Sequence, residues 1–245
     1  RNWIQKRFVS QLVIHADVGC HFALLHFKHI IMKFMRFLLA FSFFLVIVIT
    51  ASCQKHSESF EGIIKYHVIY ESTSSEISAE FLKTTFGDTA IVYIKGGKYK
   101  QVYPNAKGYS EVIYDDRTNN YYLIRPGIDT IFFSNLEFTN EKYSFIFNNK
   151  EDSVILGYKC KVAHLKSSNC DAKYYYAPDL LLSPDPFKKH KIGGYDILTK
   201  NTKSIYLAKY EIFTGYKIST SAYFLNKLNL EDSIFTLPNL PIKHY

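Results

Sequence analysis

The sequence lacks the short motifs that mark the commonest catalytic and metal sites. From residue 53 onward no histidine stands three or four residues from another, and no His-Glu-x-x-His zinc motif occurs. Residues 108–112 resemble a nucleophile elbow but carry Val112 where a second glycine is needed. Gly96-Gly97 is too short to cradle a phosphate and suits a tight turn. We therefore expect no catalytic residue, no metal ligand, no cofactor and no enzymatic activity.

An apolar run long enough for a transmembrane helix is also missing from the N-terminal region. The uncharged run over residues 37–52 is shorter than the about 20 residues that a spanning helix needs. Lys33 and Arg36 precede it and small residues end it, which is typical of a secretory signal. Thr50-Ala51-Ser52-Cys53 resembles the bacterial lipobox, although leucine is commonest where Thr50 stands. The resemblance implies a lipid on Cys53; the alternative is an ordinary signal peptide or a single membrane anchor with an incidental cysteine.

The charge balance argues against nucleic-acid binding. Residues 1–52 hold six of the 30 Lys and Arg and one of the 22 Asp and Glu. The remaining part therefore has 24 cations and 21 anions, a net charge of +3. A nucleic-acid-binding domain would show a basic stripe or a strongly basic balance. No polybasic block that would attract acidic lipid is present either.

The chain divides into five parts. Residues 1–31 begin with Arg1 and precede a complete signal that starts at Met32, so we interpret them as an untranslated upstream extension or an unusual leader. The rest is large enough for one domain with a core of its own. We assign a lipoprotein signal peptide to residues 32–52, a polar tether to 53–59, a β domain to 60–238 and a loose tail to 239–245.

Alternating side chains predict strands in the domain. Ile64, Tyr66, Val68 and Tyr70 share one face at period two, as in a strand with one buried face. Turn signals predict hairpins about Gly96-Gly97, residues 115–120 and residues 167–169. Further strands are expected at residues 129–135, 153–166, 172–178, 204–213 and 216–226.

The remaining segments are predicted to be one helix and several loops. Residues 74–86 read as a short helix that Gly87 ends and whose Ile77 and Phe81 cover the sheet. Residues 136–150 and the proline-rich stretch after Pro178 are expected to be loops. Strands joined by tight turns, without alternating strand–helix units, indicate a mainly β domain with an antiparallel sheet.

Six stretches occur in an order that resembles a known family. They are F-E-G-I-I-K-Y, Y-I-K-G-G-K-Y-K, Y-D-D-R-T-N-N-Y-Y-L-I, I-L-G-Y-K-C-K, Y-Y-Y-A-P-D-L and L-E-D-S-I-F-T-L-P. Residues 60–238 thereby resemble uncharacterised Gram-negative envelope lipoproteins related to the lipoprotein-carrier (LolA/LolB-like) fold. A neighbouring family shares the Gly-Tyr-Lys-Cys element, but its Gly-Leu-Pro-Gly-Leu-Ile motif is not matched by residues 191–195. The resemblance implies a curved, incompletely closed antiparallel half-barrel with one or two short helices on its concave side.

Two functions follow as hypotheses. In the first, the curved sheet binds a lipid, an acylated peptide or another apolar ligand against Tyr66, Val68, Tyr70 and Phe81. In the second, the domain is a non-enzymatic accessory of an outer-membrane complex, with a filled core, no ligand and an envelope protein as partner. Either way we expect a lipid anchor in the outer membrane, facing the periplasm. Residue 54 is Gln rather than the Asp of inner-membrane retention, and no acidic run follows the cysteine.

Cys160 and Cys170 could form a disulfide in an oxidising compartment. A turn at residues 167–169 argues against it, because Cys160 would then lie opposite residue 176, about 20 Å from Cys170 along the ladder. A bridge needs Cα atoms within about 7 Å. It forms only if the strand bends or the turn lies elsewhere; otherwise Cys160 is a small core residue.

Overall fold

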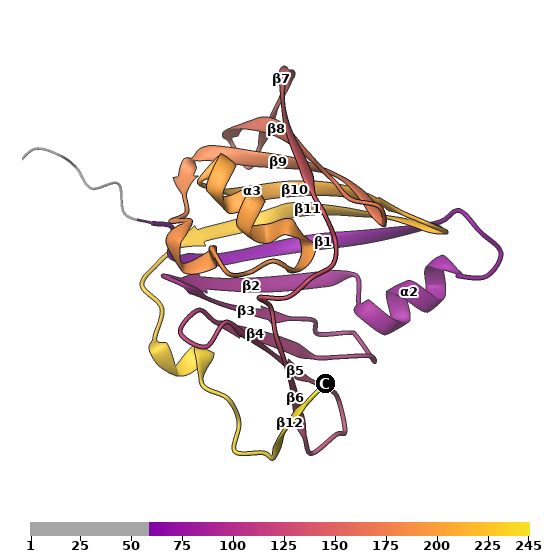
Figure 1. Cartoon of the computed structure of the whole chain (residues 1–245), viewed down its shortest axis with the longest axis vertical. Helices are drawn as coiled ribbons and strands as arrows, with labels where there is room; N and C mark the ends of the chain where they lie inside the picture. The colour runs from indigo at the N-terminus through magenta and orange to yellow at the C-terminus, as the bar shows by residue number, and fades with distance from the viewer. Residues whose placement is uncertain (1–58) are drawn as a thin grey trace, which may run out of the picture. The chain divides into compact units, whose positions relative to one another are not determined.

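The computed structural model of the chain describes residues 59–245, with only the backbone described at residues 149–151 (Figure 1). The expected upstream extension, signal peptide, Cys53 anchor and most of the tether lie outside these residues. None of the helices between residues 59 and 245 is long and apolar enough to cross a membrane.

Twelve strands form one open sheet, with β12 and β7 at its two edges. All neighbouring strands whose pairing is recorded run antiparallel except β12 and β6, which run parallel. The order is β12-β6-β5-β4-β3-β2-β1-β11-β10-β9-β8-β7. The bounds are β1 (Gly62–Ser72), β2 (Thr89–Lys95), β3 (Lys98–Val102), β4 (Glu111–Asp115), β5 (Asn120–Ile124), β6 (Ile131–Asn135), β7 (Ser144–Ile155), β8 (Tyr158–Lys166), β9 (Cys170–Leu181), β10 (Ser204–Phe213), β11 (Tyr216–Lys227) and β12 (Ile242–His244). The mainly β class and the open antiparallel sheet are confirmed.

Strand β1 lies at the centre of the sheet and contributes to its core as predicted. Ile64 and Tyr66 are buried, and Val68 packs half-buried against the same cluster. Ile64 pairs with Val92 and Tyr66 with Ala90 on β2, and all four belong to the core. Ile91, between these two β2 residues, points to the other face, because side chains alternate along a strand.

One predicted strand is in fact two. Residues 153–166 turn sharply at Leu156 and Gly157, which have φ angles of 52° and 81°. Consecutive left-handed residues make the tight turns that match the twist of a hairpin. Strand β7 therefore ends at Ile155 and β8 begins at Tyr158, and the predicted loop at residues 136–150 is partly β7.

The tail is also more regular than predicted. Residues 242–244 form β12, which pairs with β6 in parallel. Its side chains are exposed, so its order comes from backbone hydrogen bonds to β6 and leaves no apolar pattern in the sequence.

The helix predicted at residues 74–86 is shorter than expected, and a different side of it packs against the protein. Helix α2 (Ala79–Phe86) begins at Ser78, whose hydroxyl accepts a hydrogen bond from the Phe81 amide, and ends at Gly87. This start turns Leu82 toward the protein, where it is buried, and leaves Phe81 60% exposed. The prediction that Phe81 covers the sheet and faces a ligand is wrong.

A helix that the sequence did not predict covers the sheet instead. Helix α3 (Tyr195–Thr202) lies in the stretch after Pro178 and packs across β9 and β10 through Leu198, beside two short 3-10 turns, η1 (Asp185–Phe187) and η2 (Ile192–Gly194) (Figure 1). We call the face that α3 covers the inner face. It carries Tyr66, Tyr99 and Tyr174.

Two connections cross the inner face. Residues 136–143 join β6, next to the edge strand β12, to β7 at the opposite edge and run in front of the sheet (Figure 1). Residues 182–203 join β9 to β10 and include α3. The two are tied together where the Lys191 amide donates to the Leu136 carbonyl oxygen at 2.8 Å. Together they form a second layer over part of the sheet.

Candidate functional site

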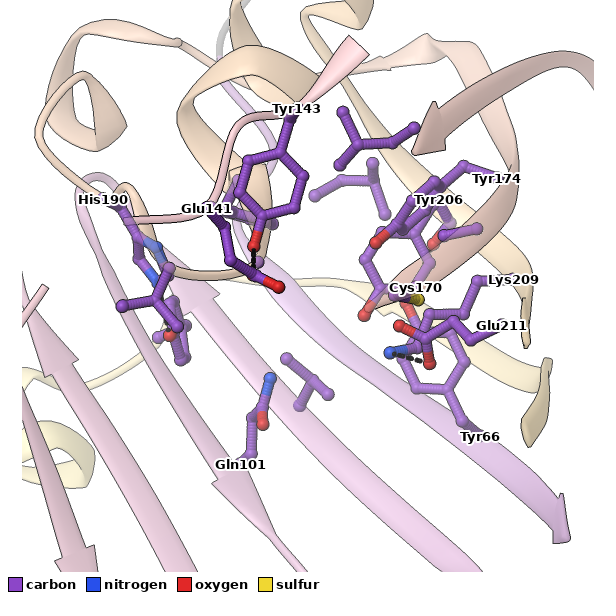
Figure 2. Close-up of a pocket in the computed structure, with 18 of the residues that line it drawn as sticks. Tyr66, Gln101, Glu141, Tyr143, Cys170, Tyr174, His190, Tyr206, Lys209 and Glu211 are labelled. Atoms are coloured by element: carbon purple, nitrogen blue, oxygen red, sulfur yellow. Dashed lines mark hydrogen bonds and ion pairs between the residues drawn. The ribbon is translucent and has the colours of Figure 1, made fainter. Parts of the chain in front are cut away.

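A cavity of about 410 Å³ lies between the inner face, the crossing segment 136–143 and the loop before α3 (Figure 2). Its walls come from elements far apart in the chain. The lining residues are Tyr66, Val92, Ile94, Tyr99, Gln101, Glu141, Tyr143, Leu165, Asn169, Cys170, Ala172, Tyr174, His190, Ile192, Gly193, Tyr195, Ile205, Tyr206, Lys209, Glu211 and Phe213.

Three tyrosines from three strands form one wall of the cavity. Tyr206 on β10 lies 5.7 Å from Tyr66 on β1 and 5.5 Å from Tyr174 on β9, measured between ring centroids. The β10–β11 ladder begins only at Ala208. The Tyr206 carbonyl lies beyond it and accepts a hydrogen bond from the Tyr66 hydroxyl at 2.9 Å. This hydrogen bond ties β1 to β10 across the wall.

An ion pair faces the cavity beside this wall (Figure 2). Lys209 and Glu211 are two apart on β10 and so share a face, and Lys209 Nζ lies 2.8 Å from Glu211 Oε2. Their side chains are 24% and 12% exposed. Burial alone lowers the pKa of Lys209, but Glu211, with Tyr206 and Tyr174 nearby, outweighs it and leaves this pKa above its usual range. The pair is therefore an ammonium and a carboxylate held in a largely apolar site.

Glu141 ties the crossing segment to the β8–β9 turn. Its carboxylate accepts hydrogen bonds from the Tyr143 hydroxyl, from Asn169 Nδ2 at 2.5 Å and from Ser167 Oγ at 3.4 Å. Burial, and the hydrogen bond to Glu141, raise the pKa of Tyr143, so this phenol remains a donor. Three donors thus hold the Glu141 carboxyl group in place at one border of the cavity.

His190 lies on the side of the cavity away from the ion pair (Figure 2). The residue is 7% exposed, and its ring packs against Tyr114 and Tyr195. His190 Nε2 and the Tyr99 hydroxyl share a hydrogen bond of 2.9 Å, whereas Nδ1 has no partner. Burial lowers the pKa of His190 to about 4, so the imidazole is neutral at physiological pH.

Cys170 borders the cavity as a thiol. Burial, with Glu211 nearby, raises its pKa to about 11, so it is protonated at neutral pH and is not a nucleophile. Cys160 and Cys170 are both free, and the disulfide raised as an option does not form. Lys161 pairs with Tyr176 and Lys166 with Asp171, so the two cysteines lie at opposite ends of the β8–β9 ladder.

Of the four residues predicted to face a ligand, one lines the cavity. Tyr66 does so, while Val68 and Tyr70 lie farther along β1 at a shallow hollow beside α2. Phe81 lines neither. Within residues 59–245 no three His, Cys, Asp or Glu side chains gather into a metal site.

The sequence did not single out the polar residues of the cavity. Lys209 and Glu211 show the period of two that a strand requires, and the predicted strand at 204–213 includes them. Charged residues on a strand usually face solvent, and nothing in the sequence marks this face as the covered one. His190 lies in a stretch predicted to be an irregular loop.

The chain matches no protein-family model and no curated protein. It is similar to solved structures at low identity. With one crystal structure of PNGF-II it shares 14% identity at a TM-score of 0.45, covering 76% of this chain and 32% of that chain. The chain thus spans about a third of the length of PNGF-II.

Two further structures are covered over most of their length. One is an uncharacterised conserved protein from Thermus thermophilus, at 6% identity, a TM-score of 0.44, 76% of this chain and 91% of that chain. The other is a LolA superfamily protein from Nitrosomonas europaea, at 8% identity, a TM-score of 0.36, 73% of this chain and 91% of that chain. A LolA superfamily protein and an uncharacterised protein are thus among the structural neighbours. At TM-scores below 0.5 these likenesses say nothing about ligand or activity.

Proposed function

We propose that the domain binds a small, mainly apolar molecule, such as a lipid or an acylated peptide, in the cavity of the inner face. The observation that carries this proposal is the cavity itself. Its volume of about 410 Å³ falls within the roughly 300–1,000 Å³ of ligand pockets. Aromatic and aliphatic side chains predominate in its lining, and a few polar groups converge on it, which is the composition expected of such pockets.

The alternative, an accessory domain with a filled core and no ligand, is less well supported. Tight packing leaves few voids larger than a water molecule in a filled interior. The space between Tyr66, Leu165 and Tyr195 is far larger than that. We retain the proposal that the protein is not an enzyme, since the polar residues at the cavity offer binding groups and the Cys170 thiol is protonated.

We further propose that the protein is a lipoprotein anchored through Cys53 to the periplasmic face of the outer membrane. The apolar run that ends in Ala51-Ser52-Cys53 supports this. The membrane would then be one partner and the apolar ligand the other. Changing Cys53→Ala should abolish acylation; a variant that still carries acyl chains would refute the anchor.

Mass spectrometry of molecules that co-purify with the full chain tests the binding function. We expect an apolar compound at close to one molecule per protein with the wild type. Ala172→Phe fills the cavity, because Ala172 is buried and lines it, and should weaken binding about tenfold or more, a loss of about 1.4 kcal/mol, so that less of the compound co-purifies. Ala79→Phe on α2, outside the cavity, is the matched control. Equal occupancy in both variants would contradict the proposal.

A further inference from the structure

The polar end of the cavity is an ion pair in which each charge is already neutralised by the other. Lys209 and Glu211 lie 2.8 Å apart, and both line the cavity. The carboxylate is the more deeply buried partner, at 12% exposure. A buried pair of this kind is stable only while both charges are present, because removing one leaves an uncompensated charge in apolar surroundings.

The other titratable groups at the cavity do not offer a free charge. His190 is neutral because its pKa is lowered to about 4. Three donors from Tyr143, Ser167 and Asn169 already satisfy the carboxyl oxygens of Glu141. The cavity therefore holds no unpaired cation, among the residues described, for an acid to bind.

A neutral polar group can nevertheless bind to the pair without disrupting it. An ammonium has three N–H donors, and among the described residues Glu211 is the acceptor recorded for Lys209. A hydroxyl or amide oxygen of a ligand can accept a second hydrogen bond from Lys209. The hydroxyl or amide hydrogen can donate to Glu211 at the same time, since a carboxylate has about four lone-pair sites.

We propose that the cavity selects apolar molecules whose polar group is uncharged, such as an alcohol, an amide or an ester, over fatty acids and alkylamines of equal length. This inference rests on the proposed binding function and adds the class of ligand. An anion would bring a second negative charge beside Glu211, and a cation a second positive charge beside Lys209. In either case one charge stays unpaired in a site of low dielectric, where such a charge is expensive.

Four probes of equal chain length test the selection: decanol, decanamide, decanoate and decylammonium. Each is titrated by calorimetry at pH 7.5 into the full chain. With the wild type we expect decanol and decanamide to bind about tenfold or more tighter than either ion, a difference of about 1.4 kcal/mol. The wild-type order needs no variant, so it decides the inference even where a variant fails to fold.

Two single variants should then change the order of affinities, one in favour of the anion and the other in favour of the cation. Glu211→Gln leaves the Lys209 ammonium unpaired and should shift the preference toward decanoate. Lys209→Met leaves the Glu211 carboxylate unpaired and should shift it toward decylammonium. Circular dichroism of each variant verifies its fold.

The outcomes separate this inference from the function on which it rests. A wild type that binds decanoate or decylammonium best overturns the selection and leaves apolar binding intact. Folded variants that keep the wild-type order also overturn it, because the pair would then not set the preference. If none of the four probes binds to the wild type, the binding function itself fails and the inference fails with it.

Discussion

Acidification should destabilise the domain between pH 6.5 and pH 4 through His190. Burial lowers the pKa of this residue from 6.5, the ordinary value, to about 4 in the fold. Between these values the unfolded chain binds the proton more readily than the folded chain, so acid favours unfolding. This stability is fully present above pH 6.5 and is lost as the pH falls toward 4. The lowered pKa values of Asp88 and Asp115 act mainly below their ordinary value of 3.8 and so outside this window.

The size of the effect follows from the same pKa difference. At 1.36 kcal/mol per pKa unit, the difference corresponds to a loss of about 3 kcal/mol at pH 4. His190 is only 7% exposed, so solvent screening reduces this figure little. With a denaturant dependence of roughly 2–3 kcal/mol per molar urea, the unfolding midpoint should fall by roughly 1 M. Urea unfolding of the full chain, followed by circular dichroism at pH 7.5 and pH 4, measures it.

A variant identifies the group responsible. His190→Gln keeps a hydrogen-bonding partner for Tyr99 but does not titrate, so its loss of stability between the two pH values should be smaller by about 3 kcal/mol. His67→Gln, on an exposed residue of β1, is the matched control and should retain the wild-type loss. If His190→Gln loses as much stability as the wild type, the reasoning from burial is refuted.

The remaining predictions concern packing, charge and thiols. Leu82→Ala should cost about 2–5 kcal/mol because Leu82 is buried, whereas Phe81→Ala should cost about 0.5 kcal/mol or less; equal costs in urea unfolding would contradict the placement of α2. Lys209→Met should destabilise by about 2–4 kcal/mol, and adding Glu211→Leu should recover most of that loss; a double variant no more stable than the single one would contradict the buried pair. Under denaturing, non-reducing conditions both cysteines after residue 53 should react with maleimide; protection reversed by a reductant would indicate a bridge.

The features that the sequence predicted well have local causes. Strand β1 alternates at period two because one of its faces is buried, and this pattern is visible without any partner strand. The hairpin at Gly96-Gly97 depends on Gly96 with φ of 56°, a backbone conformation that glycine adopts readily. The start of α2 was misplaced because Ser74 and Ser78 are both suitable N-caps, and only the packed structure decides between them.

The features that the sequence missed depend on contacts between distant segments or on weak local signals. Helix α3 has eight residues and begins after Gly194 with no side-chain cap, so it has few of the usual helix signals. The turn at Leu156 uses a non-glycine residue with positive φ, which sequence patterns rarely indicate. The cavity wall joins Tyr66 to Tyr206 across 140 residues. Such a contact has no local pattern that could have predicted it.

The position of a bound ligand tests the central claim most directly. A crystal of the full chain with a bromine-labelled long-chain alcohol would locate the bromine by its anomalous scattering. The cavity proposal predicts one strong peak between the inner face and α3, within contact distance of Tyr66 or Tyr174, and its absence in Ala172→Phe. A bromine peak only at the exposed surface of the sheet, with the cavity empty or filled by side chains, would contradict it.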